Sequence, residues 1–289
     1  MLGFLRSFKE RGMQNGYYNA VGGMVTQFNR LDAISNNLAN LNTNAFKRDD
    51  VVIGDYLRLY ETYQQELPLK NNTKEAAKFI NRALDRVPII SDSYSDQSLG
   101  AMMQTDNPLD FALSKENLYF AIQTPQGVRY TRDGSFVVGE DGMLSTKEGY
   151  HVLSRTGLEN EEGIAINVQS QIEADKNGNI YFRVSDNEAV GEAEQNNAIA
   201  VVSFVNPRLL KKEGKNLYSY PEDKKSDRQN LATTESVRQS FLEKSNVNAV
   251  IEMTNLIETN RLVDMYSKVL KTHMDDLNTE AISKLATRA

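Results

Sequence analysis

The last long segment of the chain, residues 248–285, constrains the fold more than any other stretch. Aliphatic residues recur there every seven positions, at Leu256, Val263, Leu270 and Leu277. The line beside them carries Met253, Asn260, Ser267 and Met274, and no proline or glycine interrupts the run. This spacing predicts one helix with an a/d seam that lies against another helix. At about 1.5 Å per residue the helix is roughly 55 Å long, so it needs a partner along its length.

A second helix is predicted over residues 17–43. Its seam carries apolar residues at helical spacing, namely Val21, Met24, Phe28, Leu31 and Leu38, and Ile34 and Leu41 widen the apolar stripe. We expect the two ends of the chain to pack together, with the rest inserted between them. Asn260 and Ser267 interrupt the aliphatic seam, either to set its register or because those positions are only half buried.

Asparagines crowd the end of this second helix, at Asn36, Asn37, Asn40, Asn42 and Asn44. Asparagine is a poor residue inside a helix and a good cap. Residues 42–44 are therefore expected to end the helix. The three earlier amides are expected to contact neighbouring helices, and a poorly ordered helix end is the alternative.

Residues 49–98 are predicted to form a connecting arm. Tyr56, Leu59, Tyr60 and Tyr63 have helical spacing, and a second short helix is expected over Lys74–Arg86, ended by Pro88. The arm either touches neighbouring molecules or packs on the rest of the chain.

From Leu99 to Tyr220 the pattern is typical of short strands separated by turns such as Asp141-Gly142 and Asn177-Gly178. Strands are predicted over residues 118–123, 128–131, 135–138, 143–146, 150–153, 164–168, 171–174, 180–184 and 198–205. The predicted class is α+β: a coiled-coil domain of both termini with an inserted antiparallel sandwich or barrel-like body. We place the domains at 1–48 plus 243–289, at 49–98 and at 99–242.

Composition excludes several functions. The net charge of −6 argues against nucleic-acid binding, and the absence of cysteine excludes disulfides and thiolate metal sites. No apolar run approaches the ~18 residues that span a bilayer. The first residues are too short and too charged a stretch for a secretory signal, so if the protein leaves the cytoplasm we expect it to do so without an ordinary cleaved signal.

We identify no catalytic, cofactor-binding or metal-binding residue. His151 and His273 lie on unrelated segments without metal-ligand spacing. The stretch Asp175–Asn179 places its glycine too early for a calcium loop and is predicted to be a turn. We therefore expect no enzyme, no cofactor and no small-molecule substrate.

Four ordered motifs resemble the flagellar rod and hook proteins. The stretch from Leu31 to Arg48 (LDAISNNLANLNTNAFKR) is similar to their N-terminal signature, and YTRDGSF, residues 130–136, is similar to a hairpin of their body. Residues 216–218 and 245–248 resemble two later family motifs. One departure concerns Ala45, where the family commonly has glycine; we expect Asn44 to take the left-handed conformation instead.

The resemblance implies a subunit of the flagellar basal-body rod, exported by the type III apparatus and assembled with copies of itself and neighbouring rod proteins in the periplasm. Its implied torque-bearing assembly has an interface of nineteen residues: Val21, Met24, Phe28, Leu31, Ile34, Asn36, Asn37, Leu38, Asn40, Asn42, Phe46, Met253, Leu256, Asn260, Val263, Ser267, Leu270, Met274 and Leu277. We favour the proximal-rod subtype, with the distal rod a close second. The alternatives are a hook or other axial component and a β-domain enzyme acting on the cell wall.

Overall fold

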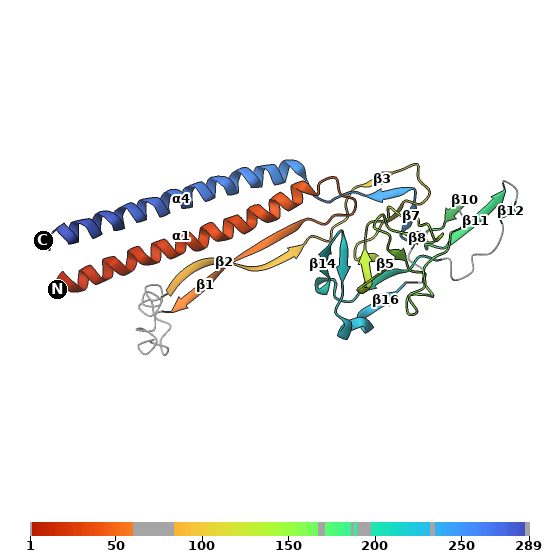
Figure 1. Cartoon of the computed structure of the whole chain (residues 1–289), viewed down its shortest axis with the longest axis horizontal. Helices are drawn as coiled ribbons and strands as arrows, with labels where there is room; N and C mark the ends of the chain where they lie inside the picture. The colour runs from red at the N-terminus through yellow and green to blue at the C-terminus, as the bar shows by residue number, and fades with distance from the viewer. Residues whose placement is uncertain are drawn as a thin grey trace. The chain divides into compact units, whose positions relative to one another are not determined.

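The structure is a computed structural model that describes residues 2–59, 84–166, 171–185, 188–189, 198–231 and 235–286. The chain is α+β and divides into two compact units (Figure 1). The helical unit contains Met1–Leu38, Asp49–Tyr94 and Ala249–Ala289, and the body unit contains Ala39–Arg48 and Ser95–Asn248. Among the described residues, no helix is long and apolar enough to cross a membrane.

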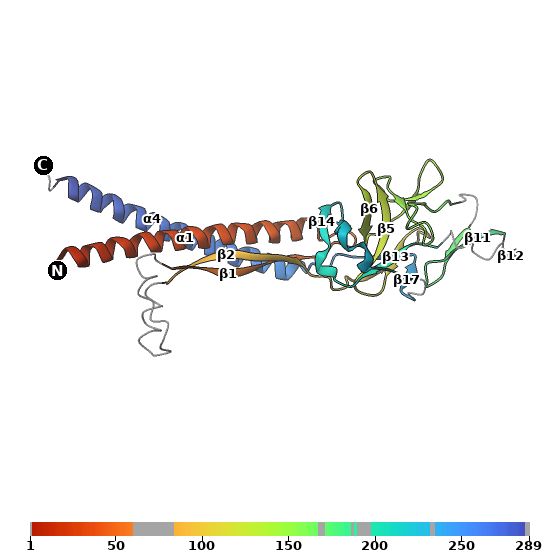
Figure 2. The same cartoon turned by 90° about the horizontal axis from the view of Figure 1, so that it is seen from below.

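The helical unit holds two long helices and two strands, shown again in Figure 2. These are α1 (Leu2–Ala39), β1 (Asp49–Leu59), β2 (Leu84–Ser95) and α4 (Ala249–Ala286). The C-terminal helix is confirmed to within a residue of its predicted bounds. The N-terminal helix is confirmed as well, although it begins earlier than predicted and ends at Ala39, before the residues expected to stop it.

The prediction of short helices in the arm is wrong where the structure describes it. Tyr56 and Leu59 lie in β1, which pairs with β2. Pro88 lies inside β2 instead of ending a helix. β-Branched residues such as Val51, Val52 and Ile53 favour an extended chain, and pairing with a second strand overrode the helical spacing of the aromatics. Tyr60, Tyr63 and most of Lys74–Arg86 lie outside the described residues.

Two glycines of α1 lie directly against α4. A Cβ atom on Gly23 would lie 2.5 Å from the Tyr266 ring, and one on Gly16 would lie 3.3 Å from His273. Both pairs are spaced by seven residues in each helix. Glu252 and Thr259, on the same seven-residue line as Tyr266 and His273, are the only described buried side chains of α4. The line facing inward is therefore one residue away from the predicted Met253–Met274 line.

The body is built on one nine-stranded sheet and several smaller ones. Seven strands follow one another in the order β14-β15-β6-β5-β9-β8-β7, and β13 joins β5 to β16. Separate sheets consist of β10-β11-β12, β17-β4 and β18-β3. The strands are β3 (Met102–Gln104), β4 (Phe111–Leu113), β5 (Leu118–Thr124), β6 (Gly127–Thr131), β7 (Val137–Val138), β8 (Leu144–Ser145), β9 (His151–Val152), β10 (Gln171–Ala174), β11 (Ile180–Ser185), β12 (Glu188–Ala189), β13 (Val201–Phe204), β14 (Lys211–Gly214), β15 (Leu217–Ser219), β16 (Arg228–Asn230), β17 (Val237–Gln239) and β18 (Phe241–Glu243), with short 3-10 turns η2 (Pro207–Leu209) and η3 (Glu222–Asp227).

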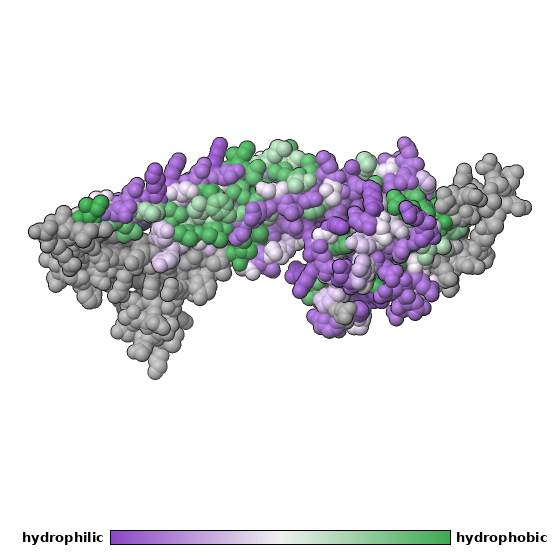
Figure 3. All heavy atoms as spheres, viewed as in Figure 1, coloured by the Kyte–Doolittle hydropathy of each residue, from purple (hydrophilic) through white to green (hydrophobic). Residues whose placement is uncertain are grey.

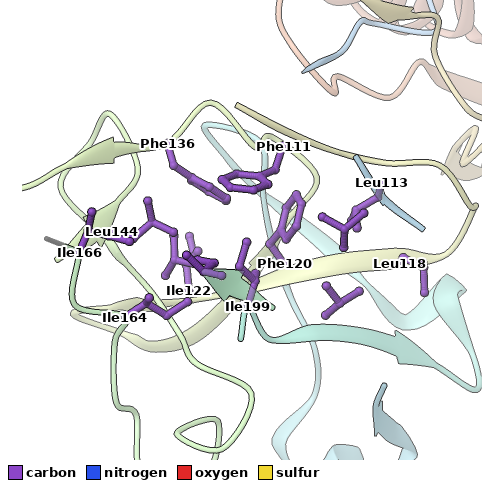
Figure 4. Close-up of a cluster of buried hydrophobic side chains, with 14 residues drawn as sticks. Phe111, Leu113, Leu118, Phe120, Ile122, Phe136, Leu144, Ile164, Ile166 and Ile199 are labelled. Atoms are coloured by element: carbon purple, nitrogen blue, oxygen red, sulfur yellow. The ribbon is translucent and has the colours of Figure 1, made fainter. Parts of the chain in front are cut away.

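The central strand β5 is buried on both faces. Phe120 and Ile122 belong to one apolar cluster, drawn in Figure 4, and Tyr119 and Ala121 belong to another on the opposite face. β13 lies beside β5, as expected of the apolar run 198–205. Because neighbouring side chains on a strand point to opposite faces, this uninterrupted apolar run supplies both cores at once.

Most of the predicted body strands are confirmed, including the one at residues 180–184 and the turn at Asn177-Gly178, where Gly178 has a φ of +82°. Several short strands carried no clear signal: β3, β4, β17 and β18 are three residues each and pair across long sequence separations. The predicted strand over residues 164–168 is not formed in its described part, where Ala165 makes an isolated bridge to Met143, and residues 167 and 168 lie outside the described part.

Candidate functional site

Three segments of the body unit lie together where the chain passes to and from the helical unit. They are residues 44–48, 95–100 and 243–248, and we call them the clasp. Arg48, Ser95 and Asn248 are three of the four body residues at which the chain crosses between the units, and the fourth is Ala39. The clasp therefore joins the N-terminal and C-terminal motifs that the sequence singled out.

The centre of the clasp is a buried carboxylate, that of Glu243. Its Oε1 accepts hydrogen bonds from Lys47 Nζ at 2.6 Å and from the Gly100 amide at 2.9 Å. Its Oε2 accepts one from Arg132 Nε at 2.9 Å and forms an ion pair with Nη2 of the same guanidinium at 2.8 Å. All three side chains are 0–1% exposed. Two cations thus share one buried anion.

The two cations complete their hydrogen bonds on backbone carbonyls. Lys47 Nζ also donates to the Ser98 carbonyl at 2.6 Å. Arg132 donates to the carbonyls of Leu113, Lys115 and Leu118, the shortest being 2.6 Å to Leu118. A buried ion pair is tolerated only when its remaining donors are satisfied in this way. Arg132 consequently ties the ends of β4 and β5 to the C-terminal segment.

Burial lowers the pKa of the Lys47 ammonium, and the Arg132 guanidinium nearby lowers it further. The Glu243 carboxylate acts in the opposite direction and only partly offsets these two effects. The main group that favours the charged form of Lys47 is therefore Glu243, and the Asp96 carboxylate contributes less to raising the pKa of Lys47. Removing Glu243 would leave two buried cations uncompensated.

The backbone of the clasp is joined by hydrogen bonds between all three segments. The Ala45 amide donates to the Glu243 carbonyl at 2.8 Å, and the Asp96 amide donates to the Arg48 carbonyl at 2.8 Å. Asn246 connects the segments through its side chain: its Oδ1 accepts from the Arg48 amide at 2.7 Å, and its Nδ2 donates to the Asp96 carbonyl at 2.9 Å. The motif at residues 245–248 therefore connects the other two segments of the clasp through the Asn246 side chain.

Ala45 takes the left-handed conformation, with a φ of 56°. The expectation that Asn44 would do so is wrong. Ala45 is 1% exposed and its amide is bound to Glu243, so the surrounding clasp imposes a conformation that costs about 1–2 kcal/mol for a residue with a Cβ. This is the position at which relatives of the resembled family commonly have glycine.

The motif YTRDGSF is a structural turn that delivers Arg132 to the clasp. A Cβ on Gly134 would lie 1.8 Å from the Phe111 carbonyl oxygen, so only glycine fits. The Asp133 carboxylate accepts from the Ser135 amide at 3.0 Å, and Phe136 is buried in the core beside Phe120. Burial raises the pKa of Asp133, although its bonds to Ser135 act against that rise.

The hairpin β14-β15 supports the clasp from one side. Asn216 Nδ2 donates to the Asn44 carbonyl at 2.8 Å, and Lys212 Nζ donates to the Lys47 carbonyl at 2.5 Å while lying 4.5 Å from the Phe46 ring centre. The motif at residues 216–218 is therefore explained by its contact with the N-terminal motif. Glu243 was missed by sequence reasoning, since an isolated glutamate at a predicted boundary carries no periodic signal.

The nineteen predicted interface residues are divided by exposure. On α1, Ile34 and Asn37 are buried, and Phe46 is buried in the clasp. Half-buried members are Val21, Met24, Leu31, Leu38, Asn40, Leu256, Val263, Ser267 and Leu270; exposed members are Phe28, Asn36, Asn42, Met253, Asn260, Met274 and Leu277. Asn37 exchanges two hydrogen bonds with the Asp49 backbone, so for this amide the expected helix contact is wrong.

His151 lies next to a serine and an aspartate in the body. Its Nδ1 is 3.1 Å from the Ser145 hydroxyl, and its Nε2 is 3.4 Å from Asp141 Oδ2. Ser145 and His151 are cross-strand partners of β8 and β9, and Ser145 is 2% exposed. A nucleophile must reach a substrate, and this hydroxyl is enclosed by its own sheet. Across the described residues, no group of three side chains could hold a metal ion.

Comparison with known proteins agrees with this geometry. Family models match three stretches: a flagellar basal body rod protein at 18–47, a hook protein FlgE/F/G D1 domain at 117–188 and a rod FlgEFG C-terminal domain at 238–283. The flagellar basal-body rod protein FlgG of Agrobacterium fabrum is 30% identical over 88% of this chain and 93% of its own length. The chain belongs to the flagellar basal-body rod protein family.

Two further members of the rod family cover nearly the whole chain. FlgG of Bacillus subtilis is 29% identical over 94% of this chain and 99% of its own length. The rod protein FlgF of Mesorhizobium japonicum is 27% identical over 96% and 100%. The outer two matched stretches supply Lys47 and Glu243, and the middle one supplies Arg132, so the ionic cluster of the clasp draws one residue from each.

Proposed function

We propose that this protein, a structural rod subunit of the flagellum, assembles with copies of itself and neighbouring rod proteins into the helical shaft that transmits torque across the periplasm. The observation that carries the proposal is the surface of α4. Its apolar residues point outward, among them Val250 at 74%, Met265 at 61% and Ile257 at 54% exposure. Figure 3 shows hydrophobic atoms at the surface along the helices of this unit.

An exposed apolar face of this length is unfavourable in water and marks a contact surface. The half-buried seam residues Leu256, Val263 and Leu270 support pairing of α4 with α1 as a coiled coil, and the exposed residues support contacts between subunits. Head-to-tail contacts that do not close produce a helical filament. We further propose that the helical ends become ordered only on assembly, when the apolar surface is covered.

The remaining parts of the proposal follow from family membership. Assembly in the basal body implies export through the type III apparatus without a cleaved signal. The two apolar clusters on either face of β5 support a sandwich or barrel-like body. We keep the proximal-rod subtype as our proposal and the distal rod as the alternative, and relatives named FlgG and FlgF match this chain with similar identity. We also propose the domain boundaries 1–48 plus 243–289, 49–98 and 99–242.

Truncation tests the proposed function. A chain lacking residues 249–289 keeps the clasp but loses α4, so we expect a folded body that does not enter rods. The measurement is incorporation of the purified chain into rods grown from the full-length protein, with the full-length chain as the control. Incorporation of the truncated chain at the full-length rate would refute a role for α4 in assembly.

A further inference from the structure

The ionic cluster of the clasp contains no residue of the helical unit. Lys47, Arg132, Glu243 and the carbonyls that they bind all belong to the body unit. Every polar contact of the Glu243 carboxylate is therefore complete without α1, α4 or the β1-β2 ribbon. The clasp does not need the helical unit in order to satisfy its charges.

The helical unit has much less to hold it together. Among the described side chains, α4 buries only Glu252 and Thr259, and the buried apolar residues of α1 are Ala20 and Ile34. Strand β5 alone has five buried residues in succession, four of them at 0% exposure. The close approaches of α1 and α4 are made by glycines against the ends of Tyr266 and His273. Regions with few buried apolar contacts open at low free energy, while tightly packed regions open only with the whole domain.

We propose that the Lys47–Glu243–Arg132 cluster keeps the clasp closed in the unassembled chain, so that order ends abruptly where the body passes to α1 at Ala39, to the β1-β2 ribbon at Arg48 and to α4 at Asn248. On this view the two chain ends leave the body from a fixed, preformed base even when the helices beyond it are open. A partner then meets two tethered segments that start side by side, which lowers the entropy lost when they associate.

The geometry of the clasp supports a sharp boundary. The amides of Ala45 and Asn246 are bound across the two terminal segments, at 2.8 Å to the Glu243 carbonyl and 3.3 Å to the Phe46 carbonyl. A Cβ on Gly100 would lie 1.8 Å from the Lys244 carbonyl oxygen, so the third segment packs directly against the backbone. Glu243 supplies both the carbonyl that binds the Ala45 amide and the carboxylate that binds Lys47 and Arg132, so one residue links the backbone bonds to the buried charges.

Hydrogen exchange of the full-length, unassembled protein tests this inference. We expect the amides of Ala45, Lys244 and Asn246 to exchange as slowly as that of Ala121 in the core. Amides of α1 and α4 are expected to exchange at least about 100-fold faster. The inference is overturned if the clasp amides exchange at helix rates, or if the helices are protected to the same degree as the clasp.

Matched variants separate the charge cluster from general packing. Glu243→Gln leaves two buried cations without an anion and should speed exchange at Ala45 and Asn246 by about 100-fold, with Ala121 unchanged. Glu213→Gln, at an exposed pair with Arg129, should change none of them. Unchanged clasp protection in Glu243→Gln would overturn the inference.

If Glu243→Gln does not fold, Lys47→Met provides the second test. It keeps the Arg132–Glu243 pair and removes one cation, so about a tenfold loss of protection confined to the clasp is expected, and no loss there overturns the inference. These measurements use the monomer alone. The rod-incorporation experiment with the truncated chain tests the proposed function, and its outcome does not change the exchange rates measured on the full-length monomer.

Discussion

The body unit and helix α4 of the helical unit bury different kinds of residue. The body buries its apolar residues and even three charges, each with a partner, around Glu243. The helical unit instead buries Glu252 and Thr259 on α4 while leaving Ile257, Met265 and Val269 exposed. The body therefore buries its apolar core within one chain, whereas the exposed apolar residues of α4 form a surface suited to contact with another molecule.

Two glycines offer the largest contrast between the units. Gly134→Ala should destabilise the body by about 3 kcal/mol, because its Cβ would strike the Phe111 backbone, which cannot move without the core. Gly23→Ala in α1 should change stability by less than about 1 kcal/mol, since the Tyr266 ring can swing aside and alanine favours a helix. Urea unfolding of both variants measures the two changes in the free energy of unfolding, and equal losses of stability would contradict the expected contrast.

A pH effect is expected from the body core. Burial raises the pKa of Tyr119 to about 12 from its ordinary value of 10.0. The folded state then binds the phenolic proton more tightly than the unfolded state. This contribution to the free energy of unfolding is fully present below pH 10 and is lost as pH rises through about 12. The loss has reached about 1.4 kcal/mol at pH 11.

Comparison of the wild type with Tyr119→Phe isolates this titration. The variant loses the bond to Gln97 and is expected to be less stable at pH 9, yet its free energy of unfolding should fall less between pH 9 and pH 11. Parallel pH curves for the two proteins would show that Tyr119 is not the group responsible.

Ala45 tests whether the clasp imposes strain. Ala45→Gly should stabilise the body by about 0.5–1 kcal/mol, because glycine adopts a φ of 56° without the cost that a Cβ brings. Ala112→Gly, at a fully buried position of β4, is the control and should destabilise it. A loss in Ala45→Gly as large as in the control would mean that Ala45 is not strained.

The smallest effect on the monomer is expected at the surface of α4. Ile257→Thr should change the free energy of unfolding by no more than about 0.5 kcal/mol, because the side chain is 54% exposed. Ile199→Thr makes the same change in the core and should cost about 2–3 kcal/mol. If Ile257→Thr costs as much as Ile199→Thr, the α4 surface is covered within the monomer.

The sequence predicted both long helices, most body strands and the family, because heptads, alternation and Asx-Gly turns are local signals. It did not predict that 49–59 pairs with 84–95, since helical spacing of aromatics competes with the extended preference of Val51–Ile53 and only the second strand decides. The sequence showed part of the clasp, because Lys47, Arg132 and Asn246 lie inside recognised motifs. Glu243, the partner that Lys47 and Arg132 share, lies outside them.

By itself, the sequence determined where the helices lie, which runs are strands and that a line of aliphatic residues follows α4. Only the tertiary structure decided which line faces α1, because a shift of one residue turns a helix by about 100° and the close fit of Gly23 against Tyr266 selects the line. It also decided that charges from residues 47, 132 and 243 meet, since long-range pairing is set by packing of the whole body and leaves no periodic trace along the chain.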